Sequence, residues 1–179
     1  MSEPAKLTIL RGLTDALKSI TPDNGFVSDL SDFDPGDGVF TPRVYRGRAM
    51  FGESDPVPML SVLEGIDSAE YVAEALPTTP FSEYWWPLIV QGWVKDDPEN
   101  PTDPAYLLLA DVRKRLAVEA KRKTTDRTDP MIFGLSCNLV RGLRFNTGIV
   151  RPANEISMYA GFHMIVEVLI TDNAETPYV

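Results

Sequence analysis

Ser136 and His163 are the two residues of this chain whose types could together perform nucleophilic catalysis, with the hydroxyl as nucleophile and the imidazole as base. Ser136 lies in the run Gly-Leu-Ser-Cys-Asn at residues 134–138, which departs from a nucleophile elbow because Asn138 replaces the second glycine. His163, the only histidine, falls within an alternating strand pattern, where a structural or interface role is favoured. A small serine hydrolase therefore stays open as a minor alternative, and we expect no catalysis.

Metal and cofactor sites are not expected either. A single histidine and a single cysteine cannot form a cluster at zinc-ligand spacing. One acidic segment holds four aspartates: Asp29, Asp32, Asp34 and Asp37. It does not match a calcium loop, because the twelfth position counted from Asp32 is Arg43 rather than glutamate. No glycine-rich run leads into Lys-Ser or Lys-Thr, so we expect a solvated acidic loop and no bound cofactor.

Aromatic residues are the first candidates for protein contacts. Trp85, Trp86 and Trp93 share one apolar stretch, and aromatic side chains serve both as core residues and as interface anchors. Core packing is the expected role for at least two of the three tryptophans. Tyr159 and His163 lie on the mixed face of the C-terminal strand pattern. We expect Trp85, Trp86, Tyr159 and His163 to lie at or near contacts between subunits.

Basic residues form a second set of interaction candidates. Seven of them follow one predicted helix and the segment after it: Arg113, Lys114, Arg115, Lys121, Arg122, Lys123 and Arg127. A solvated helix face is the ordinary explanation, and an electropositive contact for an acidic partner is the alternative. Arg46 and Arg48 follow a predicted strand and are loop candidates for docking. We expect Arg46, Arg48, Arg113 and Arg122 to contact neighbouring proteins.

Composition limits the class of protein. The chain has 179 residues, of which 44% are apolar and 24% charged, so we expect one domain over residues 1–179. The net charge of −9 argues against binding nucleic acid through the overall field. The N-terminal residues lack a signal-peptide pattern, and no apolar stretch approaches the ~20 residues of a membrane span. We expect a protein that is not exported and has no membrane partner.

Two helices are predicted. Leucine and isoleucine recur every three or four residues within 4–20, which is the spacing of an amphipathic helix. Asp103 followed by Pro104 starts a second helix that runs to about Arg122. The polar segment near 123–130 is expected to be a mobile loop. Further segments are less definite: 69–76 could form a helical turn or two, and 131–140 is ambiguous between strand and helix.

The remaining pattern predicts strands. Short strands are expected at 26–30, 39–46 and 57–63, and residues 143–150 fit a strand with a turn at 146–148. Residues 84–94 are apolar on both faces, which is typical of a strand that is covered on both sides. We expect an α+β fold in which a mixed, mainly antiparallel sheet has the two main helices packed on one face.

The C-terminal strand has the strongest local pattern. From Ile156 to Ile170, eight apolar positions alternate with mixed ones in period two. A strand of that length spans about 50 Å, whereas a compact domain of this size is roughly 30 Å across. Either Gly161 interrupts the strand with a bulge, or the strand projects beyond the domain and requires a partner.

The order of these elements resembles the tail terminator proteins of long-tailed phages, which are also called tail completion proteins. The resemblance covers roughly residues 5–171, and no single segment is specific by itself. It depends on the N-terminal helix, the long C-terminal strand and five short runs between them: Asn-Gly-Phe-Val-Ser-Asp at 24–29, Val-Tyr-Arg-Gly at 44–47, Pro-Met-Leu-Ser-Val at 58–62, Leu-Ile-Val-Gln-Gly-Trp-Val at 88–94 and Ala-Asp-Val-Arg-Lys-Arg-Leu at 110–116.

The resemblance implies a virion structural protein that is assembled in the host cytoplasm and located at the tail neck. It implies a ring, expected to hold six copies, that caps the tail tube, ends tail growth and docks the head-tail connector. Partners would be further copies, the tube protein and the connector, with the tail sheath as another candidate. Six copies would carry 6 × −9 = −54 formal charges, which would let DNA pass through the lumen without specific binding.

A third class of function stays open beside the ring protein and the hydrolase. A strongly acidic chain could mimic DNA and inhibit a DNA-binding protein. Such a mimic needs its carboxylates spread along one face, whereas here acidic and basic residues are interspersed, especially in the second predicted helix. The mimic is therefore the less favoured of the two binding hypotheses.

Overall fold

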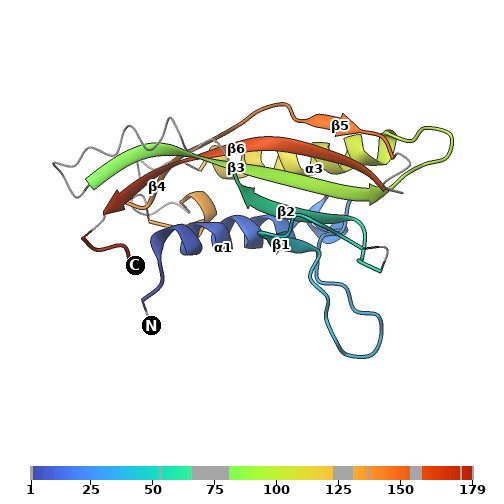
Figure 1. The fold of residues 1–179 in the computed structure, drawn as a ribbon, viewed down its shortest axis with the longest axis horizontal. Helices are drawn as coiled ribbons and strands as arrows, with labels where there is room; N and C mark the ends of the chain where they lie inside the picture. Colours follow the sequence, from blue (N-terminus) through green and yellow to red (C-terminus); the bar gives the residue numbers. More distant parts are fainter. Residues whose placement is uncertain are drawn as a thin grey trace.

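The computed structural model describes residues 2–52, 54–65, 81–122, 131–136, 138–153, 159–173 and 175–178. Figure 1 shows an elongated molecule in which two long strands run along the longest axis. In chain order, the elements are α1 (Ala5–Lys18), η1 (Pro22–Asn24), β1 (Val44–Arg46), β2 (Met59–Glu64), β3 (Phe81–Lys95), α3 (Asp103–Ala120), η2 (Ile132–Gly134), β4 (Val140–Phe145), β5 (Ile149–Arg151) and β6 (Tyr159–Asn173).

The strands form one six-stranded sheet in the order β1-β2-β3-β6-β4, with β5 paired to β6 beside β4. β1 and β2 are parallel, and the other four pairings are antiparallel. The predicted α+β class with a mixed, mainly antiparallel sheet is therefore confirmed.

β3 and β6 pair along their full length of 15 residues each, from Phe81 opposite Asn173 to Lys95 opposite Tyr159. The register does not shift at Gly161, which lies opposite Trp93, so the alternative of a bulge at this glycine is wrong. At about 3.3 Å per residue, each strand spans about 50 Å. The length predicted for the C-terminal strand is therefore present, and β3 supplies a partner of equal length.

Both helices cover the same face of the sheet, and the core lies between them and the strands. α1 contributes Ile9, Leu13 and Leu17, and α3 contributes Leu108, Val112 and Leu116. These side chains pack on one row from each long strand: Trp86, Leu88 and Val90 of β3, and Phe162, Met164, Val166, Val168 and Ile170 of β6. The alternation predicted for the C-terminal strand therefore separates a helix-covered face from an open one. In β3, which was predicted to be covered on both sides, the residues of the second face, such as Ile89, are half-buried.

The predicted strand at 26–30 is wrong, because its backbone donors bind a side chain instead of another strand. The amides of Val27 and Ser28 donate to the buried carboxylate of Asp111 on α3, at 3.0 and 2.7 Å. The strand predicted at 39–46 is reduced to β1. Its first residues belong to a loop that projects from the domain, in which Thr41 pairs with Phe33.

The other boundaries agree more closely with the structure. Residues 143–150 hold the end of β4 and the start of β5, and residues 146–148, predicted to be a turn, connect them. Within the described part of the ambiguous segment 131–140, the structure has the short η2 before β4. The predictions for 69–76 and for a mobile loop near 123–130 lie outside the described residues. In the part of the chain that the structure describes, no helix is long and apolar enough to cross a membrane.

Candidate interaction surface

The face of the sheet that the helices do not cover, called the open face below, carries exposed aliphatic side chains. Its central row joins Ile165 of β6, Ile89 of β3 and Leu63 of β2, which lie directly opposite one another. Ile165 is 43% exposed, and Ile149 of β5, in the neighbouring row beside His163, is 58% exposed. In Figure 1, α3 lies behind β3 and β6, so the open face of these strands is turned toward the viewer.

The end of the open face near β4 is occupied by polar contacts within the chain. The guanidinium of Arg144 lies 4.1 Å from the centre of the Trp85 ring and also pairs with both carboxylate oxygens of Glu167, at 2.7 and 3.1 Å. Arg141 pairs with Glu83 nearby, at 2.5 Å. These contacts cover one face of Trp85, which is half-buried, so only part of its ring is available to another protein.

The opposite end of the open face is covered by the segment between β1 and β2. The ring of Phe51 packs on Trp93 with 4.2 Å between centroids, and the guanidinium of Arg48 lies over the rings of Tyr45 and Phe51. Arg48 also pairs with Asp55 at 2.6 Å. These contacts hold Arg48 within its own subunit, and the docking role predicted for it stays a prediction.

At this same end, in and beyond the row of Trp93, the open face carries two exposed basic residues. Lys95 ends β3 and Arg151 ends β5, and both side chains point to the open face because they share the alternation of Trp93 and Gly161. Both residues are exposed, and neither makes an ion pair within the described residues. They are two strand spacings apart across the sheet and two residues apart along the strands, so their Cα atoms lie about 12 Å from each other. We call Lys95 and Arg151 the basic pair.

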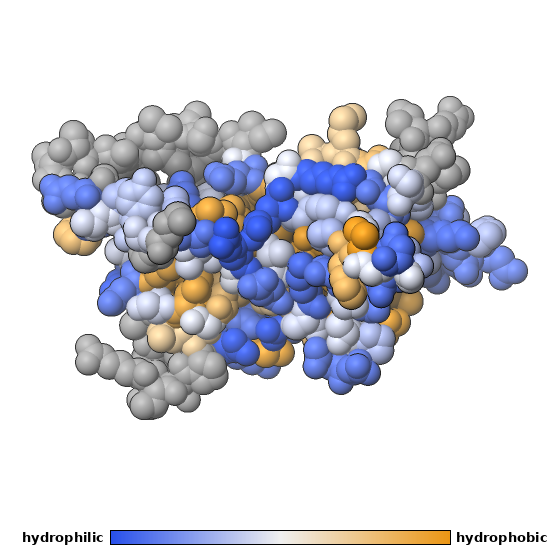
Figure 2. Space-filling model, turned by 90° about the horizontal axis from the view of Figure 1, so that it is seen from below, coloured by the Kyte–Doolittle hydropathy of each residue, from blue (hydrophilic) through white to orange (hydrophobic). Residues whose placement is uncertain are grey.

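A loop at residues 33–41 projects from the domain on the side where α1 lies (Figure 1). Phe33 and Thr41 exchange two backbone hydrogen bonds of 2.8 Å and so close its base. Within the loop, just before Thr41, Val39 is 65% exposed and Phe40 is 63% exposed. Seen from below, this side of the molecule carries apolar and polar side chains interspersed with one another (Figure 2).

The loop is ordered by its own aspartates. The amide of Gly36 donates to Asp34 Oδ1 at 2.7 Å, and the amide of Val39 donates to Asp37 Oδ1 at 2.8 Å. Asp32, just before the base, pairs with Lys18 of α1 at 2.8 Å. The acidic segment therefore builds turns rather than a cation site. Within the described residues, no group of three or more histidine, cysteine, aspartate or glutamate side chains could hold a metal ion.

Among the described residues, Asp29 and Tyr84 have a perturbed pKa. The Ser31 hydroxyl donates to Asp29 at 2.7 Å and lowers the pKa of that carboxyl, with the Ser31 amide assisting. Burial raises the pKa of the Tyr84 hydroxyl, which lies near Lys6 of α1 and Asp172. Both perturbations follow from local packing.

The structure does not bring Ser136 and His163 together. Ser136 lies just before β4, whose first residue Val140 pairs with Ile170 of β6. His163 is seven residues from Ile170 along the same strand, which corresponds to about 23 Å. Ser136 Oγ accepts a hydrogen bond from the amide of Asn138, at 3.2 Å. The proposed nucleophile and base therefore lie far beyond contact distance.

Trp86 and Arg122 both have partners within the chain, and their predicted roles in contacts stay predictions. Trp86 is 4% exposed. It lies opposite Val168, so the alternation places it on the helix-covered face of β3. The Lys6 ammonium lies 5.0 Å from the centre of its ring. Arg122 pairs with Glu119 at 3.2 Å. Tyr159 and His163 lie half-buried on the open face, and Arg46 and Arg113 are exposed.

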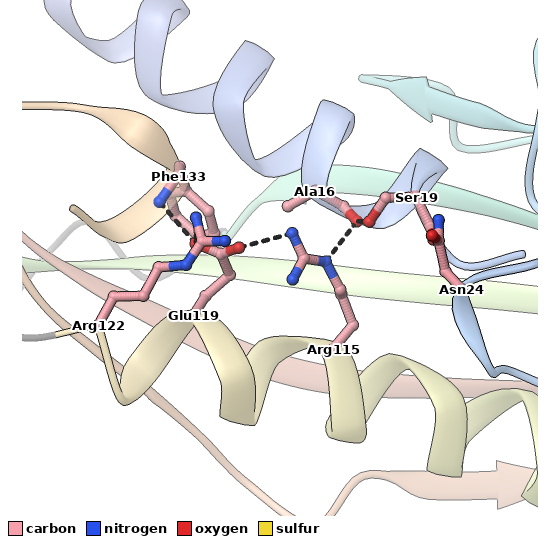
Figure 3. Close-up of polar contacts among 7 residues, drawn as sticks. All are labelled: Ala16, Ser19, Asn24, Arg115, Glu119, Arg122 and Phe133. Atoms are coloured by element: carbon pink, nitrogen blue, oxygen red, sulfur yellow. Dashed lines mark hydrogen bonds and ion pairs between the residues drawn. The ribbon is translucent and has the colours of Figure 1, made fainter. Parts of the chain in front are cut away.

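Glu119 is the most buried charged group of the chain's described part, with 0% of its side chain exposed. Figure 3 shows Arg115 and Arg122 converging on it from the same helix, with Arg115 Nη2 at 2.6 Å. The amide of Phe133 in η2 donates to Glu119 at 2.8 Å, and Arg115 Nε donates to the Ala16 carbonyl of α1 at 3.0 Å. This cluster ties α3 to α1 and η2, and we assign it a structural role.

Sequence reasoning did not select the most exposed apolar residues of the candidate surface. Ile165 was already in the mixed row of the C-terminal strand, and an aliphatic residue in such a row is a signal of contact. Val39 and Phe40 were assigned to a strand, although the acidic and glycine-rich residues before them indicate a loop.

No model of a known protein family matches this chain, and no curated protein matches it.

Proposed function

We propose that this chain is a structural protein of a phage tail neck. Its copies assemble into a closed ring, six in number, that caps the tail tube and receives the head connector. The proposal combines the resemblance in element order with the open face of the sheet. The open face is the observation on which the proposal chiefly depends, because among the described residues it leaves Ile165 of β6 and Ile149 of β5 exposed and Ile89 of β3 half-buried.

The hydrophobic effect favours covering the aliphatic row of the open face. An aliphatic row across three paired strands gains free energy when it is removed from solvent, at about 25 cal/mol per Å². Isolated exposed apolar residues are ordinary, whereas a contiguous row flanked by aromatic side chains is typical of an interaction surface. Ile165, Ile89 and Leu63 form such a row beside Ile149. A second copy of the same chain would cover it in a homo-oligomer.

The charge of the chain supports the same proposal. Six copies carrying −9 each would surround a channel with a total of −54 charges. Carboxylates that face such a channel repel phosphate and keep a passing DNA strand from binding its wall. DNA mimicry is less favoured because several of the described carboxylates, among them Asp32, Asp55, Glu83 and Glu167, are paired with basic side chains.

The first experiment measures assembly. The wild-type chain and Ile165→Asp are compared by light scattering over a range of concentrations, followed by negative-stain imaging of any rings. Ile165→Asp is expected to abolish association while leaving the free energy of unfolding within about 1 kcal/mol, because the side chain is already partly exposed. Val118→Asp is the matched control, since Val118 is 46% exposed on the outer side of α3.

The second experiment locates the protein. A labelled chain is expected at the neck of assembled particles, at the head-proximal end of each tube. Label distributed along the tubes, or absent from the particles, would contradict the proposal.

In the assembly experiment, equal loss of association in Ile165→Asp and Val118→Asp would assign the contact to α3 as well and would leave the open face without a special role.

A further inference from the structure

The projecting loop and the open face have complementary chemistry. The loop presents two apolar side chains, Val39 and Phe40, together with the carboxylates of Asp34 and Asp37, for which no ion pair is present among the described residues. The open face presents the aliphatic row and Ile149, and beside them the basic pair. Apolar surface and opposite charge therefore occur together on both surfaces.

From this complementarity we propose that residues 33–41 of one copy dock on the open face of the next copy. Phe40 and Val39 would contact Ile149 and Ile165, and the two loop carboxylates would meet Lys95 and Arg151. The inference rests on the proposed function, because it names the surfaces through which the ring closes.

The loop is suited to this role because it needs little ordering on binding. Its base is closed by the Phe33–Thr41 pair, and its tip is held by the turns at Asp34 and Asp37. The Arg43 guanidinium lies 5.2 Å from the Phe33 ring centre and also donates to the Asp29 carbonyl at 2.8 Å, which anchors the base. A segment that already has its bound shape loses less conformational entropy when it docks.

The geometry of the contact favours a ring. The loop extends away from β3 and β6 in Figure 1, so it is placed to meet another molecule rather than the open face of its own chain. Two different surfaces meet in such a contact, which makes it head-to-tail. Head-to-tail contacts repeat from copy to copy and close into a ring when the rotation per copy permits.

The outer side of α3 is the competing surface, and it is less continuous. Its exposed large hydrophobic residues lie at two places, Tyr106 and Leu107 near the start of the helix and Val118 about 16 Å farther along the helix axis. The exposed bases Arg113 and Lys121 also lie on this helix or at its end. A pair of substitutions there supplies a control of equal charge.

The test reverses charge on each surface and then mixes the two variants. One variant carries Asp34→Lys and Asp37→Lys in the loop; the other carries Lys95→Glu and Arg151→Glu on the open face. Each alone is expected to weaken self-association by about tenfold or more, as measured by light scattering or sedimentation. A one-to-one mixture is expected to regain association, because every loop then meets a face of opposite charge in an alternating ring.

The control variant carries Arg113→Glu and Lys121→Glu on α3 and at its end, which equals the charge change of the face variant. Arg113 is predicted to dock the tail tube or the connector, neither of which is present in this assay, so the control is expected to associate as the wild type does. Circular dichroism and urea unfolding establish that each variant folds. Association that survives either reversal, or a mixture that stays dissociated, overturns this contact and leaves the ring intact. A wild-type chain that remains monomeric at millimolar concentration overturns both the contact and the self-assembly of the proposed function.

Discussion

Glu119 shows how one residue can hold three elements together. Its side chain is fully buried, and it receives Arg115, Arg122 and the Phe133 amide. We expect Glu119→Ala to lower the free energy of unfolding by about 3–5 kcal/mol, because it leaves two guanidinium groups and a buried amide without their acceptor. Urea unfolding monitored by tryptophan fluorescence measures the change.

Two further variants show whether that loss comes from the charge. Glu119→Gln keeps an acceptor for the Phe133 amide but removes the charge, so it is expected to be less destabilising than alanine. Arg113→Ala, on the same helix but exposed, is expected to change stability by no more than about 0.5 kcal/mol. A loss for Glu119→Ala as small as that of Arg113→Ala would show that the cluster contributes no net stability.

At the scale of single residues, the sequence predicted exposure less well than it predicted element type. Trp86 and Arg122 looked like contact residues because tryptophan and arginine are frequent at interfaces. Their burial and pairing depend on the neighbours that the fold supplies: Val168 lies opposite Trp86 on the helix-covered face, and Glu119 lies one turn before Arg122. Glu119 itself was not singled out, because nothing in a charged helix marks one glutamate as buried.

At the scale of elements, local periodicity carried most of the prediction. The two helices and the two long strands have runs of three- or two-residue spacing that sequence alone reveals. The errors fall where a segment takes its partners from far along the chain. Residues 26–30 look like a strand, but the amides of Val27 and Ser28 bind Asp111, a residue more than eighty positions later. No local pattern announces such a partner.

Gly92 provides a test of how closely the strands pack. It is buried in the centre of β3, opposite Phe162 of β6. A Cβ atom there would overlap the Phe162 ring and lie 2.9 Å from Cδ2 of Leu60, so the aromatic ring occupies the space that the glycine leaves. We expect Gly92→Ala to lower the free energy of unfolding by about 1–3 kcal/mol, because three packed strands must shift.

Thermal and urea unfolding measure the effect, and Gly52→Ala is the matched control. A Cβ at Gly52 would approach nothing closer than Asp55 Oδ2 at 4.0 Å, so this variant is expected to be nearly neutral. If Gly92→Ala is as stable as the control, the pairing of glycine with phenylalanine is not required for the strands to fit.

At the scale of the whole molecule, two electrostatic effects act on assembly in opposite directions. Copies that carry −9 each repel one another at long range, and this repulsion weakens with added salt. The proposed contact between the acidic loop and the basic pair attracts at short range. Which effect dominates can be decided by a variant that changes both in a known direction.

Replacement of residues 34–40 by Asn-Gly is such a variant. Phe33 and Thr41 already exchange both backbone hydrogen bonds, which is the closing pair that a two-residue hairpin turn requires, so the domain is expected to keep its fold. The change removes Asp34 and Asp37, and the net charge becomes −9 + 2 = −7.

If long-range repulsion governed assembly, the shortened chain would associate more tightly than the wild type. We expect the opposite, an association at least about tenfold weaker at every salt concentration, because the shortened chain lacks Val39 and Phe40 as well as both carboxylates. Sedimentation at low and high salt, with unfolding measured in parallel, separates the two results.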